Sequence, residues 1–170
     1  MDAWAQIFAR CTDAVLWVHS FTEESRINFL RLLEARGIAR DRVYFANIKG
    51  ELVDHIARIK NADLALDTFP YNGHTTTSDA VRVGVPVLCI KGNSFASRVS
   101  ASMLKHAGLD ELITQDAQSY VEVAVDLYNN RTKLTRLREK IESHDFQKNF
   151  LSCDILIPEF EHALIKIHND

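Results

Sequence analysis

The pattern of hydrophobic and polar positions alternates along the chain between segments typical of strands and segments typical of helices. Short runs of apolar and β-branched residues predict strands at 14–20 (AVLWVHS), 42–48 (RVYFANI), 64–69 (LALDTF), 86–91 (PVLCIK) and 111–114 (ELIT). After each run, apolar residues recur with helical spacing. Strands that alternate with helices are typical of βαβ units. The pattern therefore predicts an α/β fold with a Rossmann-like parallel sheet and flanking helices.

Caps and glycines set the expected limits of the helices. Thr22 is typical of a helix start, and Gly37, Gly84 and Gly108 are typical of positions just past a helix end. Helices are therefore expected at 2–11, 22–36, 52–59, 76–83 and 94–108. The tail from 117 to 169 has helical spacing throughout. We expect one domain, with an α/β core over 1–115 and a helical tail over 116–170.

The chain opens in a helix, ahead of its first strand. A doubly wound domain opens with a central strand, so we expect that one strand is missing and that the chain is a fragment of a longer protein. The strands beside that position would keep unpaired backbone edges. We expect a partner polypeptide, a homo-oligomer or a rearranged sheet to cover them.

Composition narrows the class of protein. The formal charge of −3 is spread over mixed acidic and basic residues, which predicts no nucleic-acid partner. No apolar run reaches the ~20 residues of a membrane span, and the start lacks a signal peptide, so we expect no membrane contact and a cytoplasmic location. Cys11, Cys89 and Cys153 lie far apart, which suits buried thiols in a reducing compartment.

The junction at 69–79 (FPYNGHTTTSD) gathers many small donors between a strand and a helix. A helix N-terminus leaves backbone N–H groups unpaired and carries partial positive charge, so it favours an anion. The threonines at 75–77 add hydroxyls there, and His74 adds an imidazole. Asn72 and Gly73 allow a tight turn that approaches a ligand closely. This pattern indicates a phosphate site.

Two observations bear on that hypothesis. Asp79, one turn into the helix, suits the paired hydroxyls of a ribose, and a second polar turn at 91–98 (KGNSFASR) follows the neighbouring strand. Threonines before a helix most often form only a cap. The pattern alone leaves a nucleotide site and a plain cap about equally open. Ser97 and Arg98 stay open between contacting a diphosphate and bracing the next helix.

Residues 62–104 resemble the signature of the O-GlcNAc transferase and SPINDLY-like glycosyltransferases, family 41. The matching pieces are LDTFPYNGHTT at 66–76, Asp79, GVPV at 84–87 and FASRV at 95–99. The resemblance implies the C-terminal catalytic lobe of a two-lobed GT-B enzyme, incomplete at its N-terminal end. The residues expected to bind a UDP-sugar are His55, Arg58, Asn72, Gly73, His74, Thr75, Thr76, Asp79, Ser97 and Arg98.

Within this set the resemblance assigns separate roles. It implies that Thr75 and Thr76 hold the diphosphate with His74 beside them, that Asp79 binds the ribose, and that His55 lies against the uracil ring. Arg58 would be the basic group near the base, although from the residues alone His55 is more simply a surface histidine. The family implies inverting transfer of N-acetylglucosamine from UDP-GlcNAc to a protein serine or threonine, with no metal and no cofactor.

The match fails at the family's catalytic lysine. Neither Lys49 nor Lys60 stands at its position, and Leu52 replaces a second lysine, so the catalytic residues are unknown. The N-terminal lobe, through which the protein acceptor would bind, has no counterpart. We therefore expect weak binding of UDP and little transfer by the isolated chain. The alternative is a truncated, non-catalytic nucleotide-sugar-binding or interaction module; a GT-B sugar epimerase is a weaker third, because its ribose-binding glutamate turn is absent.

Overall fold

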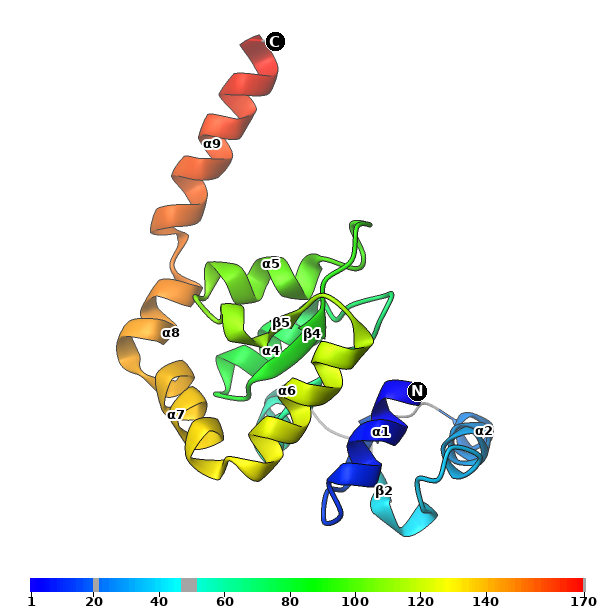
Figure 1. The fold of residues 1–170 in the computed structure, drawn as a ribbon. Helices are drawn as coiled ribbons and strands as arrows, with labels where there is room; N and C mark the ends of the chain where they lie inside the picture. Colours follow the sequence, from blue (N-terminus) through cyan, green and yellow to red (C-terminus); the bar gives the residue numbers. More distant parts are fainter. Residues whose placement is uncertain (20–21, 47–51, 170) are drawn as a thin grey trace.

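The structure is a computed structural model that describes residues 1–19, 22–46 and 52–169. Its strands are β1 (Leu16–His19), β2 (Val43–Ala46), β3 (Ala65–Leu66), β4 (Val87–Ile90) and β5 (Ile113–Thr114). The helices of the first part are α1 (Asp2–Arg10), α2 (Glu23–Glu34), α3 (Leu52–Ile59), α4 (Thr75–Arg82) and α5 (Val99–His106), with short 3-10 turns at Arg40–Arg42 and Asp110–Leu112. The tail holds α6 (Ala117–Asn129), α7 (Arg131–Glu142), α8 (His144–Leu151) and α9 (Cys153–Asn169), which extends away from the body in Figure 1.

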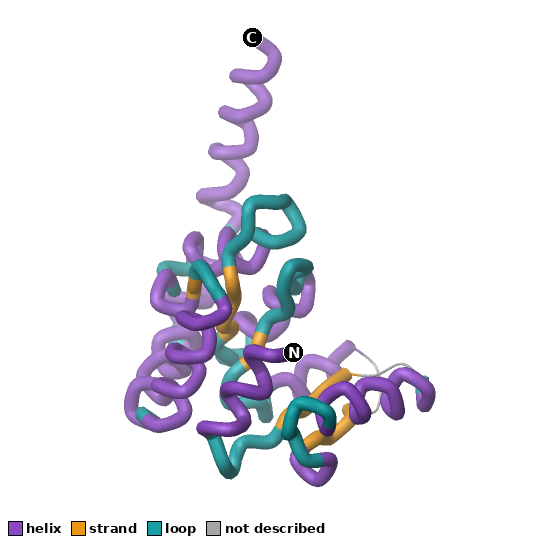
Figure 2. The backbone as a smooth tube through the Cα atoms, turned by 45° about the vertical axis from the view of Figure 1, so that its right-hand side comes forward, coloured by secondary structure: helices purple, strands orange, loops and turns teal. Residues whose placement is uncertain are grey.

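The strands form two parallel sheets where the sequence predicted one. β1 pairs with β2, and β3, β4 and β5 pair in that order. Within the described part of the chain, β1 and β3 do not pair with each other. Figure 2 shows the strands in two separate groups.

Buried apolar residues join the two sheets into one body. One cluster gathers Ile7 and Phe8 of α1, Leu33 of α2, and Val121 of α6 around β1. A second cluster gathers residues of α4, β4, α5 and α7. Helix α6 contributes to both clusters, because Leu127 belongs to the second. Strand β4 does the same, since Leu88 belongs to the first cluster and Val87 to the second. Burial of such side chains contributes roughly 1.5–3 kcal/mol each, so α6 and β4 both link the two clusters.

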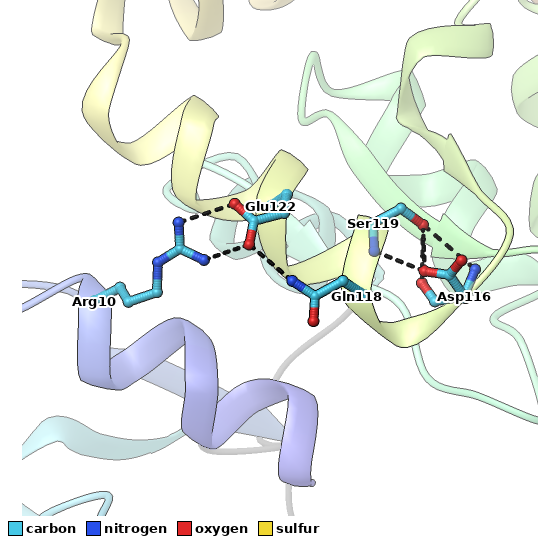
Figure 3. Close-up of polar contacts among 5 residues, drawn as sticks. All are labelled: Arg10, Asp116, Gln118, Ser119 and Glu122. Atoms are coloured by element: carbon cyan, nitrogen blue, oxygen red, sulfur yellow. Dashed lines mark hydrogen bonds and ion pairs between the residues drawn. The ribbon is translucent and has the colours of Figure 1, made fainter.

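A surface ion pair reinforces the contact between α1 and α6. Arg10 donates from Nη1 and Nη2 to the two carboxylate oxygens of Glu122, at 2.7 and 2.9 Å (Figure 3). Gln118 donates to the same carboxylate, and Asp116 caps α6 through Ser119. Because both ionic side chains are about half exposed, the pair contributes only ~0–1 kcal/mol.

Arg42 holds the connection from α1 to β1. Its guanidinium donates to the backbone carbonyls of Phe8 at 3.0 Å, Cys11 at 2.5 Å and Ala14 at 2.8 Å. The same group lies 4.7 Å above the centre of the Phe8 ring. One side chain thus satisfies carbonyls in the last turn of α1 and just after it, where a helix leaves its last C=O groups without partners.

The structure corrects several predicted boundaries. The strand expected at 64–69 is limited to Ala65–Leu66, and from Thr68 onward the chain forms hydrogen bonds within the loop. The helix expected at 94–108 starts only at Val99, and the turn before it is held by Ser94 and Ser97. The continuous helical tail is broken at Asn130, Ser143 and Ser152. Residues 20 and 47–49, including Lys49, lie outside the described residues.

The cysteines divide into two environments. Cys11 and Cys89 are buried, and burial raises the pKa of the Cys89 thiol to about 12, which keeps it protonated and unreactive near neutral pH. Cys153 is exposed, so the expectation of a buried thiol was wrong there. No helix in the described part of the chain is long and apolar enough to cross a membrane.

Candidate functional site

The loop between β3 and α4 is organised around one carboxylate. Oδ1 of Asp67 accepts the backbone N–H of Thr68 at 2.9 Å and that of Gly73 at 2.7 Å. The Thr68 hydroxyl donates to the carbonyl of Tyr71, and Asn72 Nδ2 donates to the carbonyl of Thr68. These bonds close residues 67–73 into a compact turn, and Asn72 is fully buried within it.

The second polar turn packs against the first. The backbone N–H of Asn72 donates to the carbonyl of Ala96, and the Ser100 hydroxyl donates to the carbonyl of Gly73 at 2.9 Å. Ser100 also lies 2.7 Å from the buried hydroxyl of Thr77. The predicted convergence of the two strand-end turns is therefore confirmed.

The N-terminus of α4 carries the predicted anion-binding groups. Thr75 and Thr76 are exposed in the first turn of the helix, whereas Thr77 points inward and is buried. The ring of His74, at the N-cap position, stacks on Tyr71 with centroids 5.4 Å apart and contacts the edge of Phe95. An exposed helix start with two hydroxyls and a fixed imidazole can hold an anion.

Gly73 allows the backbone to pass close to these threonines. A Cβ atom at this position would lie 2.6 Å from Oγ1 of Thr76 and 2.6 Å from Oγ1 of Thr77. Such contacts are far inside van der Waals distance, so a larger side chain would displace one of the two hydroxyls. Glycine is favoured here by these two hydroxyls and not by a positive φ angle, and its close approach to a ligand stays a prediction.

His55 and Arg58 form the second part of the site. Arg58 Nη2 lies 2.8 Å from His55 Nδ1, and because a guanidinium only donates, Nδ1 must be the acceptor and Nε2 carries the proton. Nε2 faces Asp79 Oδ2 at 3.9 Å. The His19 ring contacts the His55 ring edge-on, and burial together with the nearby Arg58 lowers the pKa of His19.

Buried polar atoms without a hydrogen-bond partner gather at this end of the molecule. Among the described side chains they include Asp67 Oδ2, Asn72 Oδ1 and His74 Nε2. Buried polar groups are rarely left unpaired, so these three atoms make the turn a candidate ligand site. Burial raises the pKa of Asp67, although the N–H groups of Gly73 and Thr68 oppose this shift.

A cavity of about 980 Å³ connects the two parts of the site. Of the predicted site residues, the cavity is lined by His55, Arg58, Gly73 and Thr76. The others lie outside its lining. Asn72, His74 and Thr75 lie in the same turn as Gly73, and Asp79 faces His55. Ser97 and Arg98 lie on the neighbouring loop. Ser97 is buried and bonds to Ser94, which favours bracing, whereas Arg98 is exposed ahead of α5.

The sequence patterns did not identify two residues that lie at the site. Asp67 was counted as part of a strand, although a lone acidic residue at the end of an apolar run is itself a signal. His19 also ends a strand, and only the folded chain brings it to His55. Within the described residues, no group of three His, Cys, Asp or Glu side chains is arranged to hold a metal ion.

Comparisons with known proteins agree on one family. Residues 1–158 match the family described as glycosyl transferase family 41. The chain is 32% identical over 141 residues to the UDP-N-acetylglucosamine--peptide N-acetylglucosaminyltransferase of Caenorhabditis elegans, covering 83% of this chain and 12% of that protein. It is 33% identical over 141 residues to the probable enzyme of this name, SPINDLY, of Solanum lycopersicum, covering 81% and 15%.

A solved structure shows the same fold. A mutant O-GlcNAc transferase from Thermobaculum terrenum superposes with a TM-score of 0.88 at 31% identity, covering 96% of this chain and 32% of that one. This likeness confirms the predicted fold class, a Rossmann-like lobe with a helical tail. The chain spans a small part of the length of these relatives.

Proposed function

The chain belongs to glycosyl transferase family 41, and on that premise we propose that residues 1–170 form the donor-binding lobe of an inverting, metal-independent transferase of N-acetylglucosamine. UDP-GlcNAc is the proposed donor, and a protein serine or threonine is the proposed acceptor. The observation that carries the proposal is the start of α4. There Thr75 and Thr76 are exposed beside the unpartnered Nε2 of His74.

The arrangement fits the two ends of a nucleoside diphosphate. The first turn of α4 offers N–H groups, hydroxyls and the positive end of the helix dipole to the phosphates. His55 and Arg58 lie across the same cavity, where they suit the base, while Asp79 is the proposed ribose acceptor. The hydrogen bond from Arg58 orients the imidazole of His55, whose Nε2 faces Asp79 at 3.9 Å.

The chemistry follows from where charge develops. The acceptor oxygen forms a bond to C1 of the sugar while the bond from C1 to the β-phosphate oxygen breaks. The electron pair of that bond stays on UDP, so donors fixed at the diphosphate stabilise the transition state more than the ground state. One such displacement inverts the configuration at C1. The hydroxyl proton leaves to a base that we do not assign to this chain.

Catalysis requires more than this lobe. The chain covers only 12% and 15% of the length of these relatives. The resemblance implies a catalytic lysine at a position that neither Lys49 nor Lys60 matches. We propose that the isolated chain binds UDP weakly and transfers little sugar, and that the acceptor binds to a lobe outside these residues. A non-catalytic nucleotide-sugar-binding module is the alternative, and the lack of that lysine favours it for the isolated chain. The cytoplasmic location remains a prediction.

Calorimetry with UDP tests the proposal. The double variant Thr75→Ala/Thr76→Ala removes both exposed hydroxyls, and it should weaken binding by about 1–3 kcal/mol, roughly 5- to 150-fold. Thr135→Ala is the matched control, because Thr135 is an exposed helical threonine in α7. Its affinity should equal that of the wild type.

The result that overturns the proposal is equally clear. If circular dichroism shows a folded wild-type chain and millimolar UDP releases no heat at two temperatures, residues 1–170 do not form a donor site. Equal weakening by the control and the double variant would also contradict the assignment to the α4 turn.

A further inference from the structure

The imidazole of His74 lies between two aromatic rings from different turns. Its ring stacks on that of Tyr71, with centroids 5.4 Å apart and planes inclined by 7°. Phe95 meets the same imidazole in a T-shaped arrangement, with centroids 5.9 Å apart. Tyr71 belongs to the turn after β3 and Phe95 to the turn after β4, so the two strand-end turns meet at His74.

Both flanking rings are exposed, so core packing does not explain their positions. Tyr71 is 65% exposed and Phe95 is 70% exposed. In the described part of the chain, neither residue belongs to one of the two apolar clusters. Aromatic side chains usually stabilise a fold by burying their large apolar area. These two rings are instead placed against a polar side chain at the start of α4.

Backbone hydrogen bonds fix where these two rings stand. The carbonyl of Tyr71 accepts the hydroxyl of Thr68 at 2.6 Å. The N–H of Asn72, the residue after Tyr71, donates at 2.9 Å to the carbonyl of Ala96, the residue after Phe95. This bond joins the two turns directly beside the rings. Both rings are therefore carried on backbone that hydrogen bonds hold in place.

The restraint on the His74 side chain comes from these rings. His74 stands at the N-cap position of α4, yet within the described chain its side chain accepts no capping hydrogen bond. Its Nε2 is buried and has no hydrogen-bond partner among the described residues. A histidine ring can rotate over a broad range of χ2 unless packing restrains it. The stack with Tyr71 and the contact with Phe95 supply that restraint.

We propose that Tyr71 and Phe95 are positioning residues that fix the His74 imidazole where the diphosphate of the donor binds. The inference rests on the proposed donor site, because a fixed imidazole matters only when an anion meets it at the start of α4. A side chain that is already fixed loses less conformational freedom when a ligand binds, so the affinity is higher. Neither aromatic ring contacts the donor, and each acts through His74.

An NMR titration of the full chain with UDP measures the effect, since it reaches millimolar dissociation constants. Tyr71→Leu and Phe95→Leu each keep an apolar side chain but remove a ring contact with His74, so each should weaken UDP binding by roughly 2- to 10-fold. Tyr71→Phe keeps the stacked ring and should bind UDP within about twofold of the wild type. Phe160→Leu is the matched control and should leave the affinity unchanged, because Phe160 is 61% exposed on α9, which extends away from the body (Figure 1).

A double-mutant cycle separates positioning from direct contact with the ligand. Because Tyr71 acts through His74 in the proposal, Tyr71→Leu should cause no further loss of UDP affinity in the His74→Ala variant. Equal losses in the wild-type and His74→Ala backgrounds would overturn the proposal and make Tyr71 a ligand contact. Equal weakening by Tyr71→Phe and Tyr71→Leu would also overturn it, since the phenylalanine keeps the stack.

The ring protons of His74 give a second readout that needs no ligand. The stacked Tyr71 ring shifts their NMR signals upfield, so Tyr71→Leu should remove this shift and Tyr71→Phe should keep it. Signals that do not move in Tyr71→Leu would contradict the stack. Absence of UDP binding by the folded wild type would overturn the donor site and the positioning role with it. Additive losses in a chain that binds UDP would overturn the positioning role alone.

Discussion

Removing the carboxylate of Asp67 should loosen the turn that carries the donor-site residues. Its Oδ1 accepts the N–H groups of Thr68 and Gly73 at 2.9 and 2.7 Å. Hydrogen bonds to a charged acceptor contribute roughly 1.5–3 kcal/mol each, and the cost of burying the charge offsets part of that gain. We expect Asp67→Ala to lower the free energy of unfolding by about 2–4 kcal/mol.

The companion variant Asp67→Asn keeps an oxygen acceptor without a charge. It should stay within about 1 kcal/mol of the wild type at pH 7, because the loss of charge-assisted bonds is balanced by a smaller desolvation cost. Asp63→Ala is the control, since Asp63 is an exposed aspartate four residues earlier in an ion pair with Arg131. It should cost less than about 1 kcal/mol.

The pH dependence tests the same reasoning independently. Burial raises the pKa of Asp67 above its ordinary value of 3.8. A raised folded-state pKa means that protonation favours the folded chain, so this stabilisation is present below pH 3.8 and is lost as the pH rises through the folded pKa. The stability of Asp67→Asn relative to the wild type should therefore increase as the pH rises from 3.5 to 7.

Urea unfolding followed by circular dichroism measures these differences. For a chain of this length the alanine variant should also lower Tm by about 4–16 °C. Equal losses in Asp67→Ala and Asp67→Asn would show that the charge, and not the two accepted hydrogen bonds, holds the turn. A difference between Asp67→Asn and the wild type that does not change with pH would refute the burial argument.

Three further substitutions test other contacts. Gly73→Ala introduces a methyl group 2.6 Å from the Thr76 hydroxyl. Calorimetry should therefore show a UDP affinity lower by roughly tenfold, and the free energy of unfolding should fall by about 1–3 kcal/mol. Unchanged affinity would contradict this. Arg42→Lys keeps the charge, but a lysine cannot reach the three backbone carbonyls at once. Urea unfolding should show a free energy of unfolding lower by about 2–4 kcal/mol. A decrease under ~0.5 kcal/mol would mean that these three hydrogen bonds contribute little. Tyr120→Phe removes the hydroxyl that donates to the backbone carbonyl of Asp67 at 3.0 Å. The free energy of unfolding should fall by about 1–2 kcal/mol. An unchanged value would indicate that water replaces the hydroxyl.

Local signals in the sequence predicted most elements because their causes are local. The cap at Thr22 and the positive-φ glycines at 37, 84 and 108 depend on neighbouring backbone alone, and the structure confirms them. The strand at 64–69 was predicted too long, because the backbone N–H and the hydroxyl of Thr68 make their hydrogen bonds within the loop. Apolar character continues past the point where pairing ends, so hydrophobicity cannot locate that end.

The site was predictable only where it is contiguous in sequence. The turn from Asn72 to Thr76 appears as one run of polar residues and is found as expected. The approach of His19 to His55 depends on the relative placement of β1 and α3, which no local pattern encodes. The separation of the two sheets is likewise a property of strand pairing, which no local pattern encodes.

The three consecutive threonines of α4 do two different tasks, and the helix period explains why. Successive residues are about 100° apart around a helix, so three in a row cannot face the same way. Thr77 faces inward and binds Ser100, which fixes α4 against α5, while Thr75 and Thr76 remain exposed at the first turn. A phosphate-binding helix start must be rigid to stabilise developing charge without reorganising. If α4 binds phosphate as proposed, the buried hydroxyl of Thr77 fixes the helix that presents the two exposed hydroxyls, and replacing Thr77 should affect the proposed donor site through the position of α4.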